Sequence, residues 1–137
     1  ITTLNLSGYS ALTNINIDNC KELTSIKFTG LSNLETLNVK KSQNLESIEC
    51  YSCEKITKLD TSGLTKLTKI YMPGCQAITT VRISESVPAG TDNSHLYITS
   101  KLACVQIDGD QTRFNANFQT YFPQVDSTVI KSSCNFD

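Results

Sequence analysis

The 137-residue sequence contains no tryptophan, one methionine and one histidine, and only 18% of its residues are charged. Twelve basic and thirteen acidic side chains give a formal net charge of −1. Because no basic run is present, the sequence offers no footprint for binding nucleic acid through counterion release. No apolar stretch approaches the roughly 20 residues that span a bilayer, so a transmembrane helix is not expected. The length suits one compact domain or one short repeat array.

Residue patterns for catalysis and metal binding are also missing. The only histidine, His95, lies among turn-forming residues without a nucleophile motif beside it. Paired carboxylates and a glycine-rich phosphate loop are absent as sequence patterns. Asp108-Gly109-Asp110 resembles the start of a calcium loop, but Gln119 stands where such a loop needs an acidic residue. A turn before a helix is therefore preferred over weak calcium binding, and we expect no enzyme activity, no cofactor and no metal.

Small neutral polar residues are abundant instead. Fifteen serines, seventeen threonines and eleven asparagines occupy 43 positions. Such a composition is typical of a polar β surface.

An apolar repeat of eleven residues organises the first part of the chain. Leu or Ile recurs every eleven residues from Ile1 to Ile78, and a second and a third apolar residue follow three and five positions later. Thr61 is the only polar residue among these 24 positions. Apolar residues two apart, with polar residues between and beside them, predict one short strand per unit with one face buried.

Eleven residues cannot enclose a core, so two or three units must form each coil of a solenoid. Glycine at the eighth position of odd-numbered units, as at Gly8, Gly30 and Gly74, favours a 22-residue coil. The equivalence of Cys20 and Cys53 instead supports three units per coil, a 33-residue period. Both periods remain open. A right-handed helical coiled coil, which can also have an eleven-residue period, is disfavoured by the Thr, Ser, Asn and Gly content.

The repeat is interrupted once and then ends. Turn-forming residues predict an irregular loop over 84–95, after which apolar residues resume the spacing and complete about ten half-coils in a solenoid spanning 1–107. Residues 108–137 form a separate C-terminal cap in this interpretation. Phe114, Phe118 and Phe122 share one face of a predicted short helix that ends before Pro123. Further repeats or domains are expected before residue 1, because the chain begins in phase with the repeat.

The segments LTNINIDNCKELTSIKF and LESIECYSCEKITKLDTSGLTKL resemble the leucine-rich-repeat surface proteins of Bacteroidetes-type bacteria. The likeness covers residues 1 to about 86, although Cys, Leu, Ser or Tyr replaces Asn at most corners. It implies a leucine-rich-repeat solenoid that is displayed outside the cytoplasm and binds other molecules. Residues 104–134 are similar to the closing segment of the same family, which implies a disulfide between Cys104 and Cys134.

The four other cysteines, Cys20, Cys50, Cys53 and Cys75, are interpreted as small apolar residues in repeat positions rather than as a redox or metal site. A disulfide between Cys53 and Cys75 is left open, because a 22-residue coil would stack them about 4.8 Å apart.

Outward-facing aromatic residues occur only on the odd-numbered strands, where a binding surface is predicted. Its candidate residues are Lys27, Glu49, Tyr51, Lys69 and Tyr71. A rigid sheet presenting tyrosines and mixed charge loses little freedom on binding, which favours recognition of a protein partner at a bacterial cell surface. A carbohydrate-binding surface, in which tyrosines stack on sugar rings, and a structural spacer within a larger surface protein are the alternatives.

Overall fold

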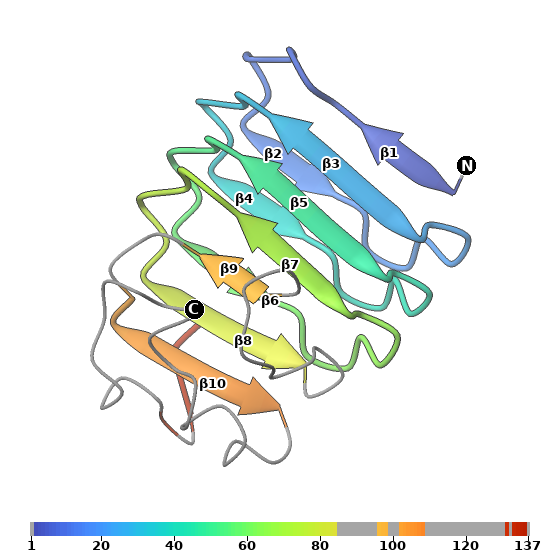
Figure 1. The fold of residues 1–137 in the computed structure, drawn as a ribbon, viewed down its shortest axis with the longest axis vertical. Coiled ribbons are helices and arrows are strands. Elements are labelled where there is room, and N and C mark those ends of the chain that lie inside the picture. The colour runs from blue at the N-terminus through green and yellow to red at the C-terminus, as the bar shows by residue number, and fades with distance from the viewer. Residues whose placement is uncertain (1, 85–95, 99–101, 109–130, 132, 137) are drawn as a thin grey trace.

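The computed structural model describes residues 2–84, 96–98, 102–108, 131 and 133–136. These residues form a mostly-β parallel solenoid of about four turns (Figure 1). The described residues contain no helix, and none of them belongs to a helix long and apolar enough to cross a membrane.

The odd-numbered strands form one continuous parallel sheet. It contains, in spatial order, β1 (Thr3–Asn5), β3 (Ser25–Thr29), β5 (Ser47–Tyr51), β7 (Lys69–Met72) and β9 (Leu96–Ile98). Its outward surface is called the odd face below.

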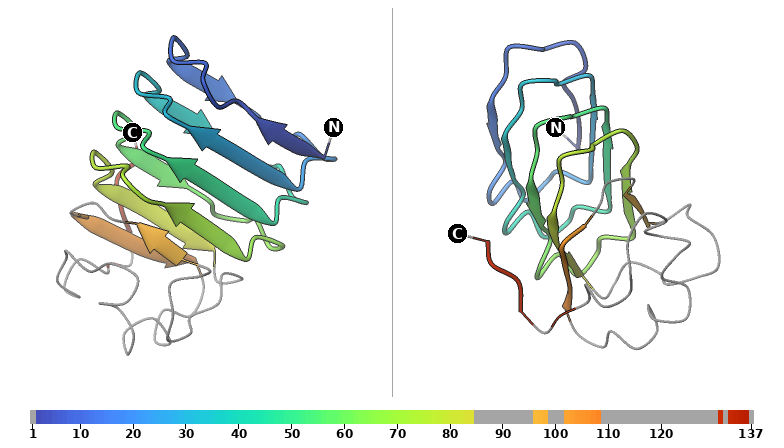
Figure 2. Two further views of the ribbon diagram at one scale, coloured as in Figure 1. Left: turned by 45° about the horizontal axis from the view of Figure 1, so that its top comes forward. Right: turned by 90° about the vertical axis from the view of Figure 1, so that its left-hand side faces the viewer.

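The even-numbered strands lie on the opposite side of the coils, as the right-hand view of Figure 2 shows. They divide into two parallel sheets, whose outward surface is the even face. One sheet pairs β2 (Asn14–Asn16) with β4 (Thr36–Asn38). The other joins β6 (Lys58–Asp60), β8 (Thr80–Ser84) and β10 (Cys104–Asp108).

The strand register settles the length of the coil. Leu4 pairs with Ile26, Ile26 with Ile48 and Ile48 with Ile70, so each partner lies two repeat units further along the chain. The 22-residue prediction is therefore confirmed, and the 33-residue alternative is wrong. Past the predicted irregular loop, Ile70 pairs with Leu96, a shift of four residues from this spacing. The strands on both sides of the insertion still stack in order.

The predicted apolar positions fill the space between the two rows of strands. Ile26, Ile48 and Ile70 are fully buried, and the exception in the pattern, Thr61, is fully buried as well. Its hydroxyl donates a hydrogen bond to the Arg82 carbonyl at 2.8 Å and accepts one from the Ser84 amide at 3.2 Å. A polar side chain is tolerated here because both of its hydrogen-bonding roles are satisfied.

The eighth position of the unit turns the chain at each described corner of the repeat. It has a positive φ in every unit from Gly8 to Gly74, including the three units that place a residue other than glycine there, Asn19, Lys41 and Ser52. A left-handed residue follows the end of each strand from β1 to β7 within one to three residues and directs the chain into the next half-coil.

A disulfide joins Cys104 on β10 to Cys134, with 5.9 Å between the Cα atoms. This confirms the pairing that the family resemblance implied. Other features predicted for the cap lie outside the described residues. These are the helix with Phe114, Phe118 and Phe122, the calcium-like loop beyond Asp108, His95 and most of the 84–95 loop.

Candidate functional site

Three tyrosines from neighbouring strands line up on the odd face. Tyr51 on β5 and Tyr71 on β7 have ring centroids 5.7 Å apart in an edge-on arrangement, with 61° between the ring planes. Tyr71 and Tyr97 on β9 stack at 5.4 Å with 27° between their planes. All three side chains are half-buried. These residues are called the tyrosine strip. Tyr71 and Tyr97 are register partners on adjacent parallel strands, whereas Tyr51 is a diagonal neighbour of Tyr71, two residues beyond its register partner Glu49.

Charged side chains flank the tyrosine strip. Lys27 on β3 places its Nζ 5.7 Å from the Tyr51 ring centroid, and Lys69 places its Nζ 5.6 Å from the Tyr71 centroid. Lys69 also forms an ion pair with Glu49, with 3.2 Å between Nζ and Oε1. The Tyr51 hydroxyl donates a hydrogen bond to the same carboxylate oxygen at 3.0 Å. Glu49 therefore connects the aromatic and the cationic groups into one network.

The network shifts the pKa of two of its members, Glu49 and Tyr51. Partial burial raises the pKa of Glu49, but hydrogen bonds from Tyr51 and Lys69 and the charges of Lys69 and Lys27 outweigh it, so the net pKa is lowered. The same hydrogen bond to Glu49 raises the pKa of the Tyr51 hydroxyl. At neutral pH Glu49 is thus a carboxylate and Tyr51 a neutral phenol, which is the pairing that their hydrogen bond requires.

The five residues predicted from the sequence lie together on the odd face. Register places Lys27 opposite Glu49 and Glu49 opposite Tyr71, in one row that continues to Tyr97. The sequence analysis missed Tyr97, although it recognised the flanking Leu96 and Ile98 as inward positions. The signal was present, because a residue between two inward positions faces outward. Because the predicted irregular loop over 84–95 interrupts the eleven-residue spacing before Tyr97, the sequence does not indicate which sheet this strand joins.

The rings of Tyr51 and Tyr71 have close neighbours within the protein. Tyr71 has the Tyr97 ring stacked against it and the Lys69 ammonium above it, while Tyr51 has the Lys27 ammonium over its ring and forms an edge-on pair with Tyr71. Sugar stacking requires an open aromatic face. The ring faces of Tyr51 and Tyr71 that meet these neighbours are closed to such stacking, and the strip adds a phenol hydroxyl and charged groups held by Glu49.

Three of the four remaining cysteines lie beside one another in the core. Cys50, Cys53 and Cys75 are fully buried free thiols, and Cys75 Sγ donates a hydrogen bond to the Cys50 carbonyl at 3.1 Å. Interaction with the Cys53 thiol, together with burial, raises the pKa of Cys50 and of Cys75. Both therefore remain protonated at neutral pH, whereas the hydrogen bonds with the Cys50 and Cys75 thiols lower the pKa of Cys53 to about 3. The described part of the chain also brings together no group of three or more potential metal ligands.

Cys20 departs from the predicted burial. It is an exposed free thiol that lines an apolar groove of about 340 Å³ at the end of the first described coil, beside Leu4, Ile17 and Leu23. Ser42, its equivalent one coil later, is fully buried. The repeat position thus determines the direction of the side chain, whereas the neighbouring coil determines whether it is covered.

Comparison with protein-family models, with curated proteins and with solved structures shows no match to this chain.

Proposed function

We propose that this chain is a non-enzymatic leucine-rich-repeat module that acts outside the cytoplasm and binds a protein partner through the tyrosine strip and its flanking charges. The observation that carries the proposal is the network in which Glu49 holds Lys69 and the Tyr51 hydroxyl beside three aligned tyrosines. Tyrosine is enriched among the residues that dominate protein interfaces, and prior ordering of these side chains lowers the entropy cost of binding.

The Cys104–Cys134 disulfide supports a location outside the cytoplasm, because structural disulfides persist in oxidising compartments. The occupied ring faces favour a protein partner over a carbohydrate on this face. A flat sheet of rigid strands also suits a broad macromolecular contact better than a small ligand.

The proposal is tested by replacing Tyr71 with a photo-crosslinking phenylalanine analogue and exposing the folded protein to purified extracellular-matrix and cell-surface proteins. We expect crosslinks to a defined protein that are lost in the double variant Tyr51→Ala and Tyr97→Ala. A matched control is Thr65→Ala, an exposed residue outside the strip, which leaves the crosslink intact.

Parallel measurement on a glycan array separates the alternatives. Sugar binding that disappears in the double tyrosine variant would assign the strip to carbohydrate and overturn the protein-binding proposal. Absence of any crosslinked partner, with display of neighbouring domains unaffected by deletion of the repeats, would instead identify a spacer.

A further inference from the structure

The even face contains a break between β4 and β6. These strands follow each other in the even row but belong to different sheets, whereas the odd strands at the same level, β3 and β5, pair over five residues. The carbonyls of Thr13 and Thr57 each accept two amide hydrogen bonds from the next coil. The equivalent carbonyl of Glu35 accepts none within the described part of the chain. The ladder is therefore open on one side of the solenoid only.

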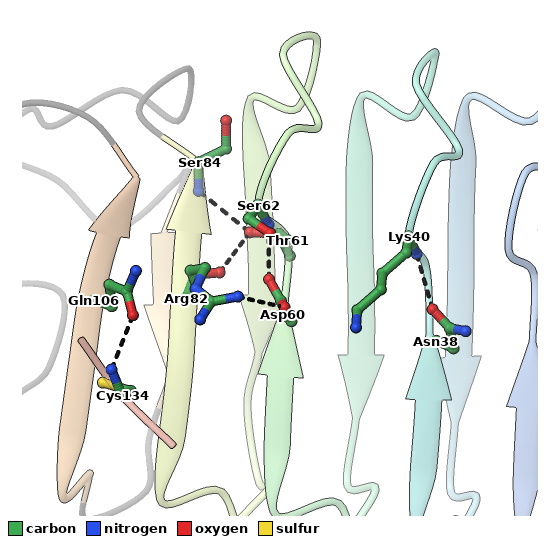
Figure 3. Close-up of polar contacts among 9 residues, drawn as sticks. All are labelled: Asn38, Lys40, Asp60, Thr61, Ser62, Arg82, Ser84, Gln106 and Cys134. Carbon is green, nitrogen blue, oxygen red and sulfur yellow. Dashed lines mark hydrogen bonds and ion pairs between the residues drawn. The ribbon is translucent and has the colours of Figure 1, made fainter. Parts of the chain in front are cut away.

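A groove of about 230 Å³ occupies the break. In Figure 3, β4, marked by Asn38, and β6, marked by Asp60, are spaced more widely than β6 and β8, and the Lys40 side chain extends toward the β6 side. The wall of the groove is formed by the residues that line it, and those that matter for recognition are Glu35, Asn38, Lys40, Lys58, Asp60 and Phe136. Together they provide an amide, two ammonium groups, two carboxylates and one aromatic ring.

Phe136 is held at this groove by contacts with the even strands. The Arg82 guanidinium carbon lies 4.4 Å from its ring centroid, so one ring face is occupied. Arg82 is itself fixed by an ion pair with Asp60, with 2.7 Å between Nη1 and Oδ2. Upstream, the Cys134 amide donates a hydrogen bond to Gln106 Oε1 at 2.9 Å, as Figure 3 shows, and the disulfide links the same residue to β10. The aromatic wall is thus positioned before any ligand binds.

The chemistry of the wall limits the class of ligand. The Asp60 carboxylate is already paired with Arg82, and the groove residues carry hydrogen-bonding groups of both signs rather than a cluster of one sign, which suits a ligand with several hydroxyls. Pockets for drug-sized ligands usually start at roughly 300 Å³. The groove is smaller than that, so it suits a single ring. An added peptide strand does not fit between β4 and β6, because the two strands still pack against each other.

We propose that the groove between β4 and β6 binds one neutral pyranose residue of a glycan, with Phe136 as its stacking wall. A pyranose has an apolar C–H face for the aromatic ring and several hydroxyls for the amide, the charged side chains and the Glu35 carbonyl. This site is separate from the tyrosine strip, which lies on the opposite face of the solenoid.

The test uses the methyl glycosides of glucose, galactose, mannose and N-acetylglucosamine as probes, with amide chemical shifts of the labelled protein as the readout. We expect at least one glycoside to bind in the millimolar range and to shift the amides of residues 35–39. The Phe136→Ala variant is expected to weaken binding about tenfold or more, and the Lys40→Met variant to weaken it about threefold. Tyr71→Ala is the matched aromatic control on the odd face and is expected to bind as the unaltered protein does.

A second arm tests the positioning of Phe136. Reduction of the Cys104–Cys134 disulfide is expected to weaken glycoside binding while the amide shifts of β3 and β5 stay unchanged, which shows that the solenoid remains folded. The proposal is overturned if none of the four glycosides shifts any amide, if the shifts map to the tyrosine strip, or if Phe136→Ala and Lys40→Met both bind normally. It is also overturned if inorganic phosphate shifts the same amides more strongly than the glycosides.

Discussion

Tyr97 stacks on Tyr71 at a centroid distance of 5.4 Å, although 26 positions rather than 22 separate them in the sequence. The pairing shows that β9 continues the odd sheet next to β7. The tyrosine strip gains its third ring in this way, because the outward position of β9 falls in the row already occupied by Glu49 and Tyr71.

The ionisation of Glu49 is a direct measure of the network around it. Because its pKa lies below the ordinary value of 4.5, the ion pair with Lys69 stabilises the folded protein at higher pH and is lost as pH falls through the lowered pKa. We expect a carboxyl NMR titration to give a Glu49 pKa below 4.5, and the Lys69→Met variant to raise it. An unchanged pKa in that variant would show that the ion pair does not form in solution.

The four free thiols differ sharply in accessibility. Cys20 is exposed, whereas Cys50, Cys53 and Cys75 are fully buried. Labelling of the native protein with a thiol-specific reagent is expected to modify Cys20 rapidly, and denaturation without reductant to release three further thiols. Intact-mass measurement counts the labels. Six labels before reduction would contradict the disulfide, and two after denaturation would reveal a bond among the buried thiols.

Thr61 is predicted to contribute to stability through its hydroxyl rather than its volume. Thr61→Val keeps the shape of the side chain but removes the hydrogen bonds with the Arg82 carbonyl and the Ser84 amide. The free energy of unfolding should fall by about 1–2 kcal/mol in urea denaturation. Thr65→Val, at an exposed position four residues further along the chain, is the control and should change it by less than about 0.5 kcal/mol. Equal effects of the two variants would refute the role of the hydroxyl.

Substitution of the corner glycines measures how much the left-handed backbone conformation at the eighth position contributes to stability. Gly30 and Gly74 have φ values of 70° and 77°, but a Cβ at Gly74 would lie 3.0 Å from Ser52 Oγ, whereas one at Gly30 meets nothing within 4 Å. Gly30→Ala should therefore cost about 1–2 kcal/mol of unfolding free energy through backbone strain alone. Gly74→Ala should cost more, measured by the same urea denaturation.

The excess cost at Gly74 should disappear when Ser52→Gly is added, because that change removes the hydroxyl and relieves the positive φ of Ser52. A double variant as unstable as Gly74→Ala alone would show that the contact with Ser52 is not the cause.

The sequence by itself determined the inward and outward direction of each residue in the regular repeat, the parallel solenoid and one dense patch of candidate residues on the odd face. These properties follow from a local rule, because alternation along a strand and a fixed eleven-residue spacing require no knowledge of distant contacts. The disulfide was anticipated from the family resemblance rather than from this rule.

Only the tertiary structure decided which coils cover which residues and where neighbouring strands fail to pair. It placed Tyr97 in the tyrosine strip, left Cys20 exposed while Ser42 is buried, and opened the even ladder between β4 and β6 beside Phe136. Each of these outcomes depends on the relative position of two coils that are distant in the sequence but adjacent in the stack. Periodicity gives the direction of a side chain, but only the packing of the next coil determines what that side chain meets.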